Sequence, residues 1–119
     1  MNWFLAKIVY RIICGNGEHT PQFDEQLRLI EAEDADKAFE KAHAIGKQEQ
    51  ESFLNQQQHL VQWQFVNVSE LYRISALIDG AELYAKVQET DNADIYMQLV
   101  HKKAEHIKQN ITHQYLQLF

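Results

Sequence analysis

The chain has 119 residues, 45% of them hydrophobic and 24% charged, a composition that fits one globular domain with its own core. Its formal net charge of −6 argues against nucleic acid and against an anionic membrane surface as partners, because both require a basic surface. A single cysteine excludes an internal disulfide, and residues 2–15 are too short and too charged for a membrane span or a leader, so we expect a cytoplasmic protein.

Residues 3–14 alternate with the period of a β-strand. One face carries Phe4, Ala6, Ile8, Tyr10 and Ile12, and the other carries Trp3, Leu5, Lys7, Val9, Arg11 and Ile13. Both faces are largely apolar, which is typical of a strand in the interior of a sheet that is covered on two sides.

A loop and a second strand follow. Segment 15–21 contains two glycines and the only proline, a composition that favours a turn. Residues 22–31 then predict a strand with Leu27 and Leu29 on one face and Arg28 and Ile30 on the other.

Residues 34–55 predict a helix that begins at Asp34, a favourable N-cap residue. Gly46 falls on the apolar stripe that also contains Phe39 and Ala42. We therefore expect the helix backbone to approach the sheet closely at Gly46.

The second half of the chain predicts two more strands and a helix. Residues 60–74 predict a strand whose apolar phase shifts, which indicates a bulge between Asn67 and Glu70. The Asp79-Gly80 pair is a strong hairpin signal, so a fourth strand is expected at 81–88. A second helix is expected over about 89–110, capped by Asp91 or Asn92, with a tail that either extends it or docks elsewhere.

The expected fold is α+β, with the element order β-β-α-β-β-α in a single domain of residues 1–119. The strand-helix-strand connection makes the second and third strands parallel in direction, so placing the third beside the first makes every neighbouring pair antiparallel. This predicts a four-stranded, mainly antiparallel sheet in the order 2-1-3-4. A right-handed crossover places the first helix on one face, and we expect the second helix to join it there.

Several strings resemble one protein family. They are NWFLAKIVYRIICG, HTPQFDEQLRLI, KAFEKAHAIG, VQWQFVNVSELY and DGAELY. Together they are similar to the small bacterial proteins grouped as the domain of unknown function DUF4288, over about residues 2–90, which leaves the second helix and the tail at 91–119. The resemblance implies no activity, and no catalytic residues carry over from it.

The loop after the first strand contains the chemically interesting side chains. Cys14 and His19 lack the paired spacing of a zinc site and the third residue of a nucleophilic triad, so we expect no metal, no cofactor and a buried, unreactive cysteine. A small-molecule site or an enzyme could still use a cleft near residues 14–28, with His19, Asp24, Glu25 and Arg28 as its polar groups. The other interpretation is that charges on an edge strand prevent edge-to-edge pairing.

The second face of the first strand is the more informative feature. If both helices lie on the opposite side, Leu5, Val9 and Ile13 need a cover, and an apolar patch of that kind usually marks an interface. Tyr115 and Leu118 in the tail could supply the cover, from the same chain or from a second copy. The leading hypothesis is therefore a non-enzymatic interaction module that forms a homodimer, with another protein as a further possible partner.

Overall fold

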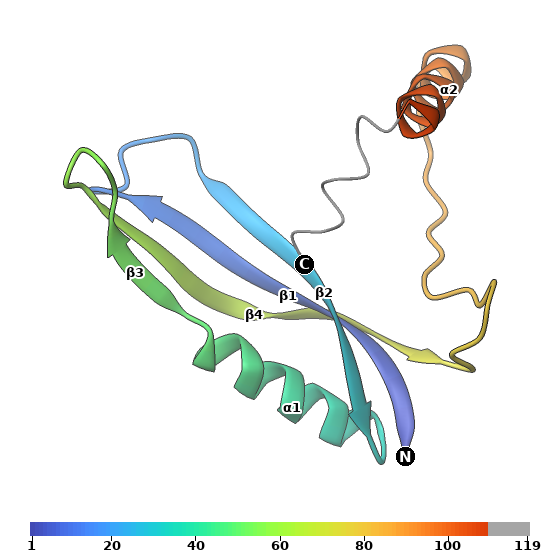
Figure 1. The fold of residues 1–119 in the computed structure, drawn as a ribbon, viewed down its shortest axis with the longest axis horizontal. Coiled ribbons are helices and arrows are strands. Elements are labelled where there is room, and N and C mark those ends of the chain that lie inside the picture. The colour runs from blue at the N-terminus through green and yellow to red at the C-terminus, as the bar shows by residue number, and fades with distance from the viewer. Residues whose placement is uncertain (110–119) are drawn as a thin grey trace. The chain divides into compact units, whose positions relative to one another are not determined.

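The computed structural model describes residues 1–109, shown in Figure 1. Its elements are β1 (Asn2–Cys14), β2 (Gln22–Ala32), α1 (Ala35–Gln48), β3 (Glu51–Leu54), β4 (Leu60–Ile74) and α2 (Ala93–Lys108). The contacts divide the chain into two units, Met1–Ala85 and Lys86–Phe119. Whether the chain behaves as one domain stays a prediction. The proposed tail contacts of Tyr115 and Leu118 lie outside the described residues.

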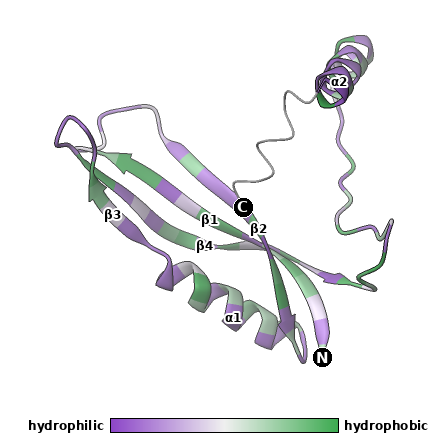
Figure 2. Ribbon diagram, in the orientation of Figure 1, coloured by the Kyte–Doolittle hydropathy of each residue, from purple (hydrophilic) through white to green (hydrophobic). Residues whose placement is uncertain are grey.

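The first unit contains a four-stranded antiparallel sheet in the order β2-β1-β4-β3. The prediction that segment 3–14 lies inside the sheet, between segments 22–31 and 60–74, is confirmed. β1 runs almost its whole length against both neighbours, with Phe4 opposite Ile30 on one side and Arg73 on the other. The sheet is therefore organised around its most apolar strand, as Figure 2 shows.

The predicted fourth strand is wrong, and so is the order 2-1-3-4 that depended on it. Residues 81–88 form no strand. The edge beside β4 is occupied by β3, which forms a hairpin with β4 through the loop at 55–59. The Asn55 side chain accepts hydrogen bonds from the backbone N–H groups of Gln57 and His59 and so holds that loop together. A local hairpin closes a short loop at lower entropic cost than a longer connection would.

Helix α1 begins as predicted and ends earlier than predicted. The Asp34 side chain accepts a hydrogen bond of 2.8 Å from the backbone N–H of Lys37, which confirms the N-cap. The helix ends at Gln48 rather than at 55, because residues 51–54 pair with β4 instead of continuing the helix.

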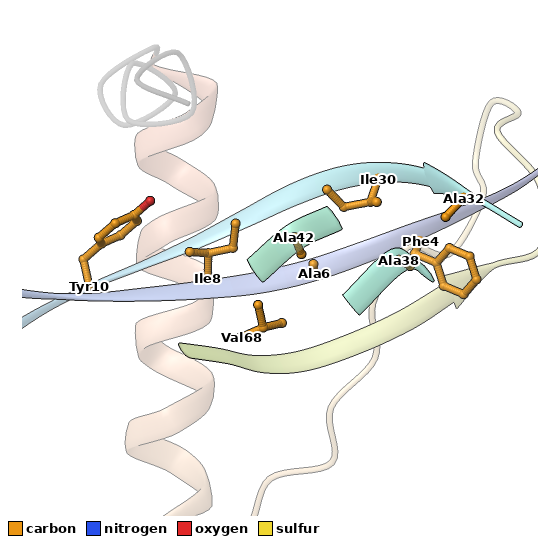
Figure 3. Close-up of a cluster of buried hydrophobic side chains, with 9 residues drawn as sticks. All are labelled: Phe4, Ala6, Ile8, Tyr10, Ile30, Ala32, Ala38, Ala42 and Val68. Atoms are coloured by element: carbon orange, nitrogen blue, oxygen red, sulfur yellow. The ribbon is translucent and has the colours of Figure 1, made fainter. Parts of the chain in front are cut away.

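The core lies between α1 and one face of the sheet (Figure 3). It consists of Phe4, Ala6, Ile8, Tyr10, Ile30, Ala32, Ala38, Ala42 and Val68. The buried residues of the helix, Ala38, Ala42 and Gly46, are all small, which lets its backbone lie close to the strands, while Ile45 packs against the core from its margin. The helix backbone approaches the sheet closely at Gly46, as predicted, since a Cβ there would lie 2.6 Å from Cδ1 of Phe65.

Strand β4 is irregular where a bulge was predicted. The register with β1 shifts between Lys7 and Ile8, which leaves Ser69 as an extra residue on β4, and shifts again between Val9 and Tyr10, at Val66. The first shift lies inside the predicted range of 67–70. The pairing of β1 with β2 shows no shift.

The second unit contains α2, whose N-cap is Asn92, one of the two predicted residues. Its side chain accepts a 3.0 Å hydrogen bond from the backbone N–H of Ile95. The expectation that this helix joins α1 on the same face of the sheet stays a prediction. Neither α1 nor α2 combines the length and the apolar character that crossing a bilayer needs.

Candidate interaction surface

The face of the sheet opposite α1 is the candidate surface, and we call it the open face. In the unit of residues 1–85, α1 is the only helix, and it packs on the other side. Paired residues of an antiparallel sheet share a face, so the register defines the members of this one. They are Trp3, Leu5, Lys7, Val9, Arg11 and Ile13 of β1, Phe23, Glu25, Leu27, Leu29 and Glu31 of β2, and Gln62, Gln64, Asn67, Glu70, Tyr72 and Ile74 of β4.

The exposed apolar side chains of the open face lie on β2 rather than on β1. The three residues that the sequence suggested are already partly covered: Leu5 is only 7% exposed, and Val9 and Ile13 are half-buried. By contrast, Phe23 is 56%, Leu27 42% and Leu29 48% exposed. The reason is position, because β1 has a neighbour on each side whereas β2 is an edge strand.

A charged cluster lies at the centre of the open face. The Lys7 Nζ is 2.6 Å from a carboxylate oxygen of Glu70 and 3.7 Å from one of Glu25. The Tyr72 hydroxyl donates a hydrogen bond to Glu70, and the Tyr72 ring contacts the ring of Tyr84 edge-on. Glu25 therefore belongs to this cluster, whose other members sequence reasoning did not select.

This cluster changes how its members titrate. Hydrogen bonding to Glu70 raises the pKa of Lys7 above its ordinary value, and the negative charge of Glu25 adds to the effect, while burial opposes it. Hydrogen bonding to the same carboxylate raises the pKa of Tyr72. Both groups therefore keep their protons more firmly in the folded protein, and Lys7 stays a cation paired with carboxylates.

Asp24 and Arg28 lie on the other face of β2, on the side of α1. Gln26 joins them, because its amide donates to Asp24 at 2.7 Å and its carbonyl oxygen accepts from Arg28 at 2.8 Å. Asp24 also accepts from the indole N–H of Trp63, and Arg28 forms an ion pair of 2.7 Å with Glu49. Sequence reasoning missed Gln26, although residues two apart on a strand share a face.

His19 holds the loop between β1 and β2. One ring nitrogen, Nε2, accepts a 3.0 Å hydrogen bond from the backbone N–H of Cys14, so Nδ1 carries the proton and donates to the carbonyl oxygen of Thr20. A cavity of about 470 Å³ adjoins this loop, lined by Cys14, Gly15, Asn16, Glu18, His19 and His59.

The four polar residues suggested for a ligand site thus lie in three places. Asp24 and Arg28 are on the helix side, Glu25 is on the open face, and only His19 lines the cavity. The alternation of side chains along a strand separates Asp24 from Glu25. In residues 1–109, no three His, Cys, Asp or Glu side chains come close enough together to hold a metal ion.

These features define a small α+β protein that has one helix-covered face and one open face on an antiparallel sheet. The chain belongs to the family described as domain of unknown function (DUF4288), whose model matches residues 3–85. This match ends at the same residue as the first compact unit. No curated protein and no solved structure gives a significant match to the chain.

Proposed function

We propose that this protein is a non-enzymatic interaction module that forms a homodimer through the β2 side of the open face. The observation that carries the proposal is the row of exposed apolar side chains on β2, Phe23, Leu27 and Leu29, on a face that no helix of residues 1–85 covers. Contiguous exposed apolar surface of this kind usually marks a contact with another molecule. The acidic charge and the single cysteine support a cytoplasmic location.

The charges on the open face fit an interface rather than a reaction centre. Lys7 is paired with Glu70 and Glu25 within the chain, so this cation is not left unpaired when the neighbouring surface is covered. General acid–base catalysis at this cluster would need a group that accepts or releases a proton near neutral pH, whereas the raised pKa values of Lys7 and Tyr72 move those two groups further from neutrality.

The test is the oligomeric state measured by size exclusion with light scattering. We expect a dimer for the natural protein and a monomer for Leu27→Glu, which adds an unpaired charge to the centre of the apolar row. Phe39→Glu is the matched control, because Phe39 is 40% exposed on α1 and Leu27 is 42% exposed on β2. A natural protein that is monomeric at high concentration, or a Leu27→Glu variant that still forms the dimer, contradicts the proposal.

A small-molecule binding role is the second candidate, and the cavity beside the loop of residues 14–19 is the observation in its favour. Its chemistry would come from His19, His59 and Glu18 rather than from the three residues on β2. Screening small-molecule fragments while following the backbone amide resonances tests it. Concentration-dependent shifts of residues 14–19 are expected if the cavity binds a ligand, and shifts only elsewhere count against this role.

A further inference from the structure

The two edges of the sheet are built differently. One edge is β3, which has only four residues. The other is β2, which has 11 residues, contains neither proline nor lysine, and pairs with β1 without a register shift. Natural proteins usually protect exposed edges by keeping them short or by adding bulges, proline or lysine. β2 has none of these four protections. It carries charged side chains instead, and Lys41 donates a 3.1 Å hydrogen bond to the Glu31 carbonyl oxygen near its end, so the outer backbone N–H and C=O groups before Glu31 are the ones available to another strand.

The side chains of β2 on the α1 side are complementary to themselves under a two-fold axis. Along the strand they run from the Asp24 carboxylate through the Gln26 amide to the Arg28 guanidinium. Hydrogen bonds from Gln26 to Asp24 and from Arg28 to Gln26 fix the positions of these side chains. If a second β2 pairs antiparallel with the axis at Gln26, Asp24 of each copy lies opposite Arg28 of the other. Opposite charges directly across a strand pair are favourable.

The side chains of β2 on the open face fit the same register. With the axis at Gln26, Phe23 of one copy lies opposite Leu29 of the other, and the two Leu27 side chains are diagonal neighbours. The three most exposed apolar residues of the open face thus meet in one cluster across the axis. Glu25 lies opposite Leu27 in the two pairs nearest the axis, between the Phe23–Leu29 pairs, and stays 3.7 Å from Lys7 of its own copy.

Neighbouring registers lack this complementarity. An axis at Glu25 places the two Glu25 carboxylates against each other, and an axis at Arg28 does the same for two guanidinium groups. An axis at Leu27 places Asp24 opposite Ile30 and Arg28 opposite Gln26, so the acidic and basic side chains no longer meet. The charges on β2 therefore select one register rather than preventing every pairing.

We propose that β2 of one copy pairs antiparallel with β2 of a second copy about a two-fold axis at Gln26, so that the two sheets become one continuous sheet. A two-fold axis perpendicular to the sheet keeps both α1 helices on one side and both open faces on the other. Each pair then joins two odd-numbered or two even-numbered residues. The backbone N–H and C=O groups that point away from β1 in one copy therefore face the same groups of the other copy. This inference rests on the proposed homodimer, for which it supplies the geometry.

Disulfide trapping tests the register. In a Cys14→Ala background, which leaves no other cysteine, Gln26→Cys places two thiols directly across the axis, at the short Cα separation that a disulfide needs. We expect mild oxidation to convert most of this variant to a covalent dimer. Asp24→Cys and Arg28→Cys should each stay uncoupled alone and should join when mixed, because each lies opposite the other.

The outcomes separate this inference from the proposed function. Efficient coupling of Glu25→Cys or Leu27→Cys in place of Gln26→Cys overturns the register, although the homodimer stands. If light scattering shows a dimer but no cysteine on β2 forms a disulfide, the interface lies elsewhere and the edge pairing is overturned. A protein that is monomeric at every concentration removes both proposals.

Two further measurements test the pairing without relying on the folding of the cysteine variants. Hydrogen exchange on the natural protein should show amides within residues 22–30 protected at high concentration and exposed on dilution, whereas concentration-dependent protection elsewhere overturns the pairing. Arg28→Glu should raise the dissociation constant of the dimer about tenfold, since the new glutamate of each copy lies opposite Asp24 of the other. Lys37→Glu makes the same change of charge on α1 and should leave the dimer unchanged.

Discussion

The contact between Gly46 of α1 and the ring of Phe65 on β4 gives the sharpest prediction about stability. Replacing Gly46 with alanine would place a Cβ 2.6 Å from Cδ1 and 2.9 Å from Cζ of Phe65. Ordinary carbon contacts begin near 3.5 Å, so the ring must retreat by about 1 Å. Its movement is restricted, because its centroid lies 5.0 Å from the ring of His43 and 6.0 Å from that of Tyr10.

Two opposing terms decide the outcome of Gly46→Ala. Overpacking a core costs about 1–3 kcal/mol, and the upper part of that range applies where the neighbouring ring cannot move freely. Alanine regains about 1 kcal/mol relative to glycine inside a helix. We therefore expect the free energy of unfolding to fall by about 1–2 kcal/mol.

Urea unfolding followed by tryptophan fluorescence measures this change, and a second variant isolates its cause. In a Phe65→Leu background the ring is gone, so Gly46→Ala should raise the free energy of unfolding by about 1 kcal/mol through helix propensity alone. The sign of the effect thus reverses between the two backgrounds. If Gly46→Ala stabilises the natural protein as much as it stabilises the Phe65→Leu variant, the close approach does not limit this position and the reasoning is refuted.

Three further predictions concern single interactions. Tyr10→Phe removes the buried 2.9 Å hydrogen bond to the Gly46 carbonyl oxygen and should cost about 1–2 kcal/mol of unfolding free energy, whereas no change in urea midpoint would show that water replaces the hydroxyl. Asp34→Ala should cost about 1 kcal/mol and Asp34→Ser much less, because only alanine lacks the capping oxygen; equal losses contradict the capping role. The raised pKa of Lys7 means that the folded protein holds this proton more tightly, so its stabilising contribution is complete below the ordinary value of 10.5 and disappears as pH rises through the folded pKa. Lys7→Met should therefore reduce the loss of stability above about pH 10.5, as measured by thermal unfolding at a series of alkaline pH values, and an unchanged profile would show that the pair with Glu70 does not contribute.

The fourth strand shows where local pattern was insufficient. Gly80 does have the positive φ of a turn, +82°, and the backbone N–H of Ala81 donates to Ile78 as a turn requires. The residues that follow it nevertheless form no strand, although β3 pairs only with residues 60–63 of β4, so a turn signal by itself does not make the next segment pair with the sheet. The signal for β3 was present in Asn55 and the glutamines after it, which connect two apolar pairs in a tight loop.

The candidate surface was predicted in outline and differs in its residues. The apolar second face of 3–14 correctly indicated a sheet with one face free of α1. The exposed apolar residues of this face are on β2. Leu5 of β1 is covered because it lies between Leu29 and Tyr72 in the sheet, and the sequence of segment 3–14 does not reveal these neighbours. The Lys7–Glu70 pair joins residues far apart in the chain, so no spacing could have indicated it.

The sequence by itself determined the family, the two helix starts, the loop after β1, the bulge in β4 and the identity of the central strand. These features depend on capping side chains, glycine, and the period of apolar residues, all of which act within a few neighbouring residues. Tertiary structure alone decided which segment occupies the edge beside β4, where α1 ends, and which side chains of the open face stay exposed. Those outcomes depend on competition among distant segments for a limited number of backbone partners, and that competition is settled only when the whole sheet is assembled.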